Sequence, residues 1–393
     1  IKLQNTAVFA YATSISYLII TLLSPLLSGI ADYGGKRKFF LRVFTTMGSL
    51  ACLSLFFFDS MSHLAIGIIG YILAMIGFAG GLVFYNSYLP EIATEDQYDR
   101  ISAKGFSMGY LGSVLLLIFN LLMVMFPEFF GFDIGTTEEA HDLAKVEAMK
   151  VSFVTVGLWW ALFSQYTFAV LPKGTSISHK VTKNIVFNGF KELKQVWVQL
   201  NQNLRLRRYL WAFFVFSMAV QTIMLVAVYF GEKEIQWADN DEKTLGLIIS
   251  ILIIQLVAIL GAVITSRASD KFGNIRTLIV VNAIWMCLCF YAYFMVTPMQ
   301  FYIAAGLVGL VMGGVQALAR STYSKFLPET EDTTSYFSFY DVAEKIGIVI
   351  GMVIFAIIDQ VSTMRNAILF LFVFFLVGIL LLFRVPRKEK APE

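Results

Sequence analysis

The sequence predicts an all-α membrane protein built from two repeated helix bundles, and three observations support this prediction. The 393 residues are 58% hydrophobic and only 15% charged, whereas soluble domains carry about 25% charged residues. Apolar stretches long enough to cross a bilayer recur along the whole chain. A pair of short motifs also occurs twice with one common spacing. An open β-sheet is excluded, because lipid cannot satisfy the backbone groups at its edges.

Eleven apolar segments predict membrane-spanning helices. Each holds about 20 or more mainly apolar residues, which is enough to cross a hydrocarbon layer about 30 Å thick. In chain order they are 6–31, 39–58, 63–89, 102–126, 150–171, 208–231, 244–266, 275–297, 299–324, 335–360 and 364–384.

The repeated motifs indicate that the two halves of the chain correspond. An Asp-x-x-Gly sequence occurs at 32–35 and again at 270–273. In each half a Leu-Pro-Glu sequence follows, with its glutamate 59 residues after the aspartate, so both motifs are offset by 238 residues. A duplication of a whole unit in so hydrophobic a chain is typical of transporters built from repeated membrane bundles.

The same offset predicts one further helix. Subtracting 238 from the span at 208–231 gives positions before residue 1, whereas the other first-half spans have second-half counterparts. The last of these is displaced by an acidic insertion at 127–149. We therefore expect a first helix that this sequence lacks, and six plus six spans in the intact protein. The expected domains are an N-terminal bundle at 1–171, a linker at 172–207, a C-terminal bundle at 208–384 and a tail at 385–393.

The distribution of positive charge predicts the orientation in the membrane. Loops on one predicted side, with the adjoining helix ends, contain 23 Lys and Arg residues, and those on the opposite side contain five. Cytoplasmic loops carry the excess of Lys and Arg. The linker and the C-terminus are therefore expected in the cytoplasm.

The linker carries its own helical pattern. Apolar residues recur at steps of three and four: Val186, Phe190, Leu193, Trp197, Leu200 and Leu204. Lysines stand between them, so the segment is expected to form an amphipathic helix on the cytoplasmic leaflet. The alternative is a simple tether between the bundles.

Several function classes are excluded by what the sequence lacks. It contains no catalytic dyad, nucleophile elbow or phosphate-binding loop, so we do not expect an enzyme or a cofactor. Its three cysteines fall in apolar runs without metal-ligand spacing, so no metal site is expected. A net charge of +3 gives no nucleic-acid footprint.

The first Asp-x-x-Gly loop resembles the signature loop of the major facilitator superfamily, Gly-x-x-x-Asp-x-x-Gly-Arg-Lys/Arg. Asp32, Gly35, Lys36 and Arg37 match this pattern, with Lys in place of the first Arg, and Ser28 takes the place of the first Gly. The resemblance implies the major facilitator fold, in which two pseudo-symmetric bundles of six helices enclose the substrate.

The second copy is less complete. Asp270 and Gly273 are kept, whereas Asn274 and Ile275 replace the basic pair and Arg276 follows one residue later. We include Arg276 in the expected gate as the substitute for that pair.

Such a loop can act as a cytoplasmic gate. A carboxylate at the end of one helix can cap the positive N-terminus of a helix in the other bundle, and the contact breaks when the bundles move apart. Asp32 is expected to face the helix start at Thr334 and Ser335, and Asp270 the helix start near Ser102. The alternative is an ordinary solvated turn.

Two longer stretches narrow the family. Residues 85–93, continuing to 109–112, and residues 313–321, continuing to 339–345, resemble the bacterial branch related to the autophagy-associated vacuolar effluxers of fungi. The resemblance covers nearly the whole chain. It implies export, amino acids as a first substrate class and a bacterial inner membrane.

Ionisable residues within spans indicate function, because their burial in lipid is costly. Asp341, Glu344 and Lys345 lie in the span at 335–360, and residues three or four apart share a helix face. A carboxylate beside a lysine at this depth could carry a coupling proton. The alternative is a structural or gating ion pair near the cytoplasm.

Five polar residues on spans expected to line the cavity are the substrate-site candidates: Tyr85, Asn86, Gln221, Gln316 and Arg320. An arginine can hold a substrate carboxylate through two parallel hydrogen bonds. Arg320 also lies near the cytoplasmic end of its span, so a gate salt bridge or a lipid-headgroup contact is an equal alternative.

We therefore predict a monomeric secondary transporter that exports a small polar metabolite, such as an amino acid, by alternating access. The expected partners are the substrate, a coupling proton and membrane lipids. Two alternatives remain: an exporter of lipids or hydrophobic drugs with the same fold, and a membrane receptor or scaffold without transport activity.

Overall fold

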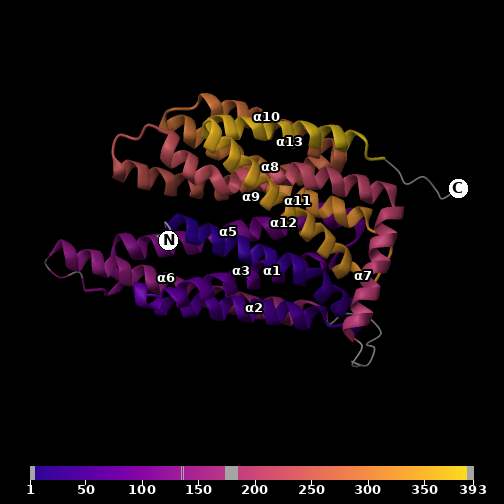
Figure 1. Cartoon of the computed structure of the whole chain (residues 1–393), viewed down its shortest axis with the longest axis horizontal. Helices are drawn as coiled ribbons and strands as arrows, with labels where there is room; N and C mark the ends of the chain where they lie inside the picture. Colours follow the sequence, from indigo (N-terminus) through magenta and orange to yellow (C-terminus); the bar gives the residue numbers. More distant parts are fainter. Residues whose placement is uncertain (1–4, 134, 136, 173–184, 387–393) are drawn as a thin grey trace. The chain divides into compact units, whose positions relative to one another are not determined.

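The computed structural model describes residues 5–133, 135, 137–172 and 185–386, which form α-helices joined by short turns (Figure 1). The helices are α1 (Asn5–Gly34), α2 (Arg37–Ser54), α3 (Leu64–Asn86), α4 (Leu89–Ile92), α5 (Tyr98–Met125), α6 (Glu138–Val170), α7 (Ile185–Gln202), α8 (Leu204–Glu234), α9 (Asn240–Phe272), α10 (Asn274–Phe294), α11 (Pro298–Phe326), α12 (Thr333–Val361) and α13 (Met364–Phe383). No β-strand occurs within these ranges, so the all-α prediction is confirmed.

Ten of the described helices are long and apolar enough to cross a membrane: α1, α2, α3, α5, α6, α8, α9, α10, α11 and α13. The sequence predicts eleven spans, and the remaining one corresponds to α12. That helix is 29 residues long, about 43 Å at the usual rise per residue. Every stretch of 18 residues within it contains three charged side chains. α12 thus differs from the other long helices in charge rather than in length.

Residues 1–88, 113–194 and 331–338 form the first of two compact units. Within it, α2 lies between α3 and α6. Gly48 of α2 makes this close packing possible, because a Cβ there would clash with the ring of Trp160 on α6. A Cβ added at Gly77 of α3 would lie 2.6 Å from the Gly48 Cα atom. Beside this crossing, the Phe84 ring stacks on the ring of Phe44, with centroids 5.8 Å apart.

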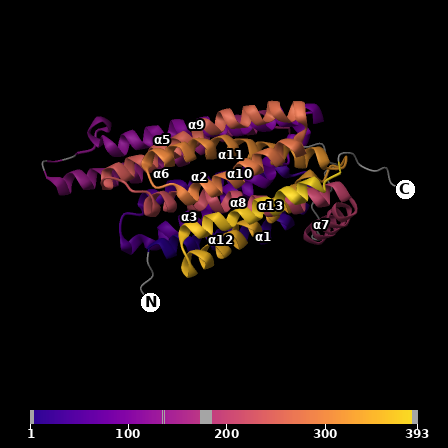
Figure 2. The same ribbon diagram turned by 90° about the horizontal axis from the view of Figure 1, so that it is seen from above.

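Residues 89–112, 195–330 and 339–393 form the second unit. α9 and α11 lie side by side in it, as Figure 2 shows. Gly309 and Gly313 of α11 face backbone carbonyl groups of α9 so closely that a Cβ at either position would clash. On α10, the Trp285 indole is fully buried and stacks on Phe375 of α13 at 5.8 Å. The domain boundaries predicted from the sequence remain a prediction.

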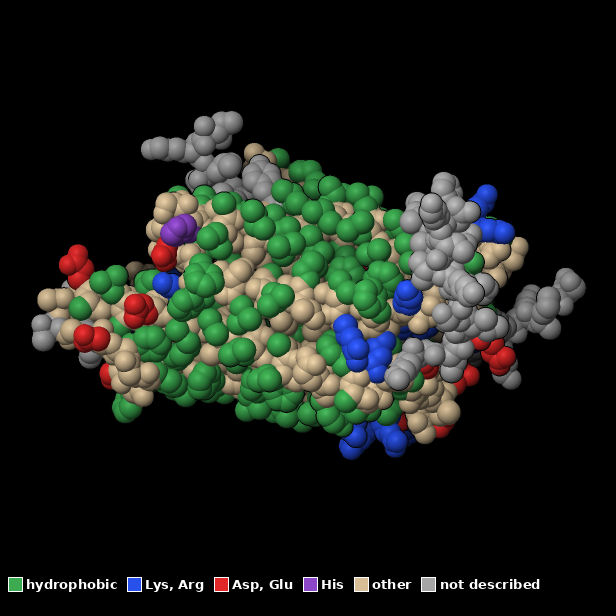
Figure 3. Space-filling model, turned by 90° about the horizontal axis from the view of Figure 1, so that it is seen from below, with side chains coloured by type: hydrophobic (Ala, Val, Ile, Leu, Met, Phe, Trp, Pro, Cys, Tyr) green, Lys and Arg blue, Asp and Glu red, His purple; other side chains and the backbone are tan. Residues whose placement is uncertain are grey.

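The outer surface is strongly apolar. Hydrophobic side chains cover most of the face seen in Figure 3, and Lys and Arg side chains gather towards one end of it. On α6, for example, Leu162, Phe163 and Tyr166 are each more than 60% exposed. Exposed apolar area of this extent is suited to contact with lipid chains.

The linker forms a helix over the part that the structure describes. α7 begins at Ile185, and residues 173–184 of the predicted linker lie outside the described residues. Val196 and Leu200 are buried, whereas Trp197 is half exposed and its ring centroid lies 5.3 Å from that of Phe339. The apolar repeat of the linker therefore predicted a helix correctly, and that helix is α7. Its placement on a membrane leaflet remains a prediction.

Candidate functional site

Asp32 caps the start of α12. It lies at the end of α1, and its Oδ2 atom accepts a hydrogen bond of 2.6 Å from the backbone N–H of Ser335. The first turn of a helix has unpaired N–H groups and a positive partial charge, so a carboxylate stabilises it there. The sequence places Asp32 opposite Ser335, and this geometry is confirmed.

Arg37 completes the contact around Asp32. Its guanidinium lies 3.6 Å from the carboxylate of Asp32 and donates to the Thr334 hydroxyl at 2.8 Å. The same group lies over the ring of Tyr88, 5.3 Å from its centroid. A buried carboxylate is tolerated when a cation and hydrogen-bond donors surround it. Arg37 and the start of α12 provide both.

The other two residues of the first motif have simpler roles. Gly35 has a φ of 60°, which is the left-handed region that favours glycine, and it makes the turn between α1 and α2. Lys36 precedes α2 and is exposed. It takes no part in the contacts between Asp32 and α12.

The second motif differs from its expected geometry. Gly273 again has a positive φ, 84°, and makes the turn between α9 and α10. Asp270 and Arg276, however, are both exposed. The expectation that Asp270 faces the helix start near Ser102 is wrong, because Ser102 is fully buried and pairs with Arg320.

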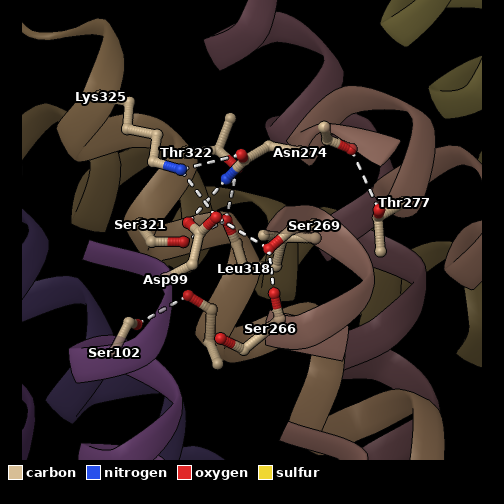
Figure 4. Close-up of polar contacts among 12 residues, drawn as sticks. Asp99, Ser102, Ser266, Ser269, Asn274, Thr277, Leu318, Ser321, Thr322 and Lys325 are labelled. Carbon is tan, nitrogen blue, oxygen red and sulfur yellow. Dashed lines mark hydrogen bonds and ion pairs between the residues drawn. The ribbon is translucent and has the colours of Figure 1, made fainter. Parts of the chain in front are cut away.

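A different carboxylate occupies the place expected for Asp270. Asp99, in the first turn of α5, is only 2% exposed and lies against the turn between α9 and α10 (Figure 4). It accepts hydrogen bonds from the Ser269 hydroxyl and the Asn274 side-chain amide, both at 2.8 Å. The ammonium group of Lys325, at the end of α11, lies 2.7 Å away. The carboxylate therefore stands on the helix start and its donors stand on the turn.

Sequence reasoning missed Asp99, and the repeat explains why. Its counterpart at the 238-residue offset is Phe337, so the comparison of the two halves gives no signal. In the motif comparison Asn274 is only the replacement of a basic residue. In the structure its side-chain oxygen accepts a hydrogen bond from Lys325 at 3.0 Å, and its side-chain amide donates to the Thr322 hydroxyl at 3.0 Å. The available signal was the position of Asp99 at a predicted helix start, where a carboxylate is favoured.

Arg320 is buried and held by α5. Its Nε atom donates to the Ser102 hydroxyl at 3.0 Å, and Nη2 donates to the Ser102 carbonyl oxygen at 3.1 Å. The guanidinium carbon lies 4.6 Å from the centre of the Phe106 ring. This candidate therefore joins α11 to α5, and several of its donors already have partners within the protein.

Three further candidates form a polar group on α8, α11 and α12. Gln221 donates from its amide to Glu344 at 2.6 Å. The Gln316 carbonyl accepts from the Tyr110 hydroxyl at 2.5 Å, and the Gln316 amide points to the sulfur of Met224 at 3.6 Å. Met224 lies one turn from Gln221 on α8, so Gln221, Gln316 and Glu344 are near one another. All three are partly exposed rather than sealed in the core.

Asp341 and Lys345 lie one helical turn apart on α12 and form an ion pair. Both are about 3% exposed, and the second carboxylate oxygen of Asp341 has no hydrogen-bond partner. An unpaired carboxylate oxygen at such depth is costly. Together with Glu344, these residues place two carboxylates and one ammonium group within a single turn of α12.

Tyr85 and Asn86 belong to the first unit. They form the last turn of α3, where Tyr85 is 39% exposed and Asn86 is partly exposed. The remaining substrate-site candidates and the Asp341–Lys345 pair belong to the second unit.

Comparison with known proteins gives a consistent result. A family model described as "Vacuole effluxer Atg22 like" matches residues 1–393. The uncharacterized MFS-type transporter YxiO of Bacillus subtilis (strain 168) is 30% identical over 386 residues, which cover 98% of this chain and 86% of that protein. Autophagy-related protein 22 of Kluyveromyces lactis is 24% identical over 416 residues, covering 95% of this chain and 79% of the relative.

Solved structures identify the fold. The E. coli fucose:proton symporter FucP superposes with a TM-score of 0.66 at 14% identity, covering 97% of each chain. The proton:xylose symporter XylE gives a TM-score of 0.70 at 13% identity, covering 95% of this chain and 85% of that one. Both are transporters of the major facilitator superfamily, so the chain has that fold. Since the family model spans the whole sequence, this multi-pass membrane protein belongs to the Atg22-like family of major facilitator transporters and is not an enzyme.

Proposed function

We propose that this transporter exports a small polar metabolite, with amino acids as the first class to test, by alternating access across a bacterial inner membrane. The observation that carries the proposal is the polar group on α8, α11 and α12. Gln221 bonds to Glu344 there, and Gln316 contacts Met224 one turn from Gln221, in a unit whose helices are otherwise strongly apolar. Polar residues inside membrane helices usually mark a substrate or ion pathway.

The charged residues of the same unit suit a zwitterionic substrate. Glu344 and Asp341 are carboxylates, and Arg320 and Lys345 are cations. An amino acid carries an ammonium group and a carboxylate, so it can form ion pairs with side chains of both signs. The family description, an effluxer, supports the outward direction.

A coupling proton is part of the proposal. Glu344 accepts a hydrogen bond from the neutral amide of Gln221, and the neighbouring Lys345 is paired with Asp341, so Glu344 can lose or gain a proton without breaking that pair. Two structural neighbours are titled as proton symporters, of fucose and of xylose, which supports proton coupling by analogy. We propose further that the protein acts as a monomer among membrane lipids, with its C-terminus in the cytoplasm.

Counterflow in proteoliposomes tests the transport proposal. Vesicles containing the purified protein are loaded with one unlabelled amino acid at a time, and uptake of the same labelled compound is measured. We expect transient accumulation for at least one amino acid, and none in protein-free vesicles. If no amino acid or other polar metabolite accumulates but a hydrophobic cation or a lipid does, the substrate class is wrong. If nothing is moved under any gradient, the transporter proposal fails.

A further inference from the structure

Asp99 has the environment of a conformational latch. Three donors surround its carboxylate: Ser269 from the end of α9, Asn274 from the start of α10 and Lys325 from the end of α11 (Figure 4). Asp99 itself belongs to the start of α5. One side chain therefore joins four helices at a single place, and almost no water reaches it, since Asp99 is 2% exposed.

The contacts of Asp99 reverse the arrangement found around Asp32. In the first motif the carboxylate stands on the turn and the donors are the start of α12 and Arg37. In the second, the carboxylate stands on the helix start and the donors stand on and beside the turn. The copied aspartate, Asp270, is exposed and contributes nothing to the contact. The aspartate position repeated in the two motifs therefore does not mark the residue that makes this contact.

Neighbouring contacts at the start of α5 are hydrogen bonds and the packing of small side chains. Below Asp99, Ser102 donates to the Ala317 carbonyl oxygen at 2.7 Å and accepts from Arg320. Ala103 packs against Ala262 and Ala317 through small side chains. Small side chains let these helices approach closely, and the ion pair between Asp99 and Lys325 adds a charged contact whose loss can be tested on its own.

We propose that Asp99, with Lys325 and Asn274, is a cytoplasmic latch of this transporter and takes the role expected for Asp270. The latch holds the start of α5 on the turn between α9 and α10 and opens during the transport cycle. The inference rests on the proposed function for the purpose of the motion. The contact itself is testable without any substrate.

Cysteine labelling measures the opening directly. Ala103 is 3% exposed and lies beneath the latch, so a cysteine introduced there is protected while the latch is closed. The background carries alanine at the native cysteines Cys52, Cys287 and Cys289. The rate of maleimide labelling of Ala103→Cys in proteoliposomes then reports how often this interface opens.

Breaking the ion pair should favour the open form. We expect Asp99→Asn and Lys325→Met each to raise the labelling rate by about fivefold or more, the usual lower limit for a coupled contact. The exchanged pair Asp99→Lys with Lys325→Asp should bring the rate back towards that of the parent protein, because the attraction is restored. Asp270→Asn should leave the rate unchanged.

A parental labelling rate in Asp99→Asn would overturn the proposal, whatever the rate in Asp270→Asn. If Asp99→Asn does not fold, Ser269→Ala removes one neutral donor and should still raise the rate, and an unchanged rate there would also contradict the latch. Because no substrate is added, the labelling result can be interpreted even if the transport proposal fails. Conversely, if the protein transports an amino acid but Asp99→Asn labels at the parental rate, only the latch proposal is rejected.

Discussion

Asp32 shows how a single carboxylate can fix the end of a helix that lies 303 positions further along the chain. Its oxygen replaces the missing intrahelical acceptor for the Ser335 N–H, and Arg37 balances its charge. The Asp32 carboxylate meets a backbone group, which any residue at a helix start offers, and the Thr334 hydroxyl joins the contact through Arg37. For this reason the sequence pattern alone was sufficient to place it.

Removing the Asp32 carboxylate should weaken the protein measurably. We expect Asp32→Ala to lower the free energy of unfolding by about 1–2 kcal/mol, the cost of losing a helix cap, with the buried charge of Arg37 left less well balanced. The measurement is the thermal unfolding midpoint in detergent. Asp270→Ala is the matched control, since it changes the same motif position at an exposed site, and its midpoint should stay close to that of the parent. Equal losses in the two variants would mean that the cap contributes nothing specific.

The residues of the candidate site were predictable in part. The charged residues of α12 were found because ionisable groups stand out in an apolar helix, and the structure places Asp341 beside Lys345 as the helical spacing predicts. Asp99 and Tyr110 were missed, because their partners are far away in sequence and neither residue type is unusual at its position. Contacts of this kind depend on how the helices pack, which local patterns do not contain.

At the scale of helices, the close packing of α9 against α11 depends on glycine. At Gly313 any side chain would collide with the carbonyl oxygen of Ala258 on α9. The helices can therefore approach until their backbones nearly touch, which is how small residues stabilise helix pairs in membranes. Most element boundaries were predictable to within a few residues, because length and hydropathy define them. The exception is α6, which begins at Glu138 rather than at 150, because its polar first turns, capped by Thr137, continue the apolar helix without adding to its hydropathy.

Two glycines on α11 give a matched test of this packing. Gly313→Ala must push α9 and α11 apart, and overpacking of this kind costs about 1–3 kcal/mol. Gly306→Ala lies on the same helix, where an added Cβ would come no closer than 3.8 Å to Ile253. We expect a lowered thermal midpoint for the first variant and an unchanged or slightly raised one for the second. Similar midpoints for both would show that the backbones do not touch at Gly313.

At the scale of the whole molecule, the charge distribution predicts which end faces the cytoplasm. A fluorescent protein fused after residue 393 should fluoresce, because it folds only if it stays in the cytoplasm. An alkaline phosphatase fused within the acidic segment 127–149 should be active, because that segment is expected on the side of the membrane opposite the cytoplasm. This expectation follows from the 23 Lys and Arg residues on one predicted side against five on the other. The opposite pair of results would invert the topology and with it the assignment of the Asp99 latch to the cytoplasmic end.

The central claim is that the polar group around Glu344 couples a proton to the movement of a small polar substrate. The most direct measurement compares Glu344→Gln with the parent in the same proteoliposomes, once under counterflow and once with an imposed pH gradient. Glutamine keeps the shape of Glu344 but cannot bind the proton, whereas Asp359→Asn removes a carboxylate elsewhere on α12 and serves as the control. We predict that Glu344→Gln keeps counterflow and loses accumulation driven by the pH gradient, and that Asp359→Asn keeps both. Accumulation of substrate by Glu344→Gln at the parental level under the pH gradient would contradict the claim.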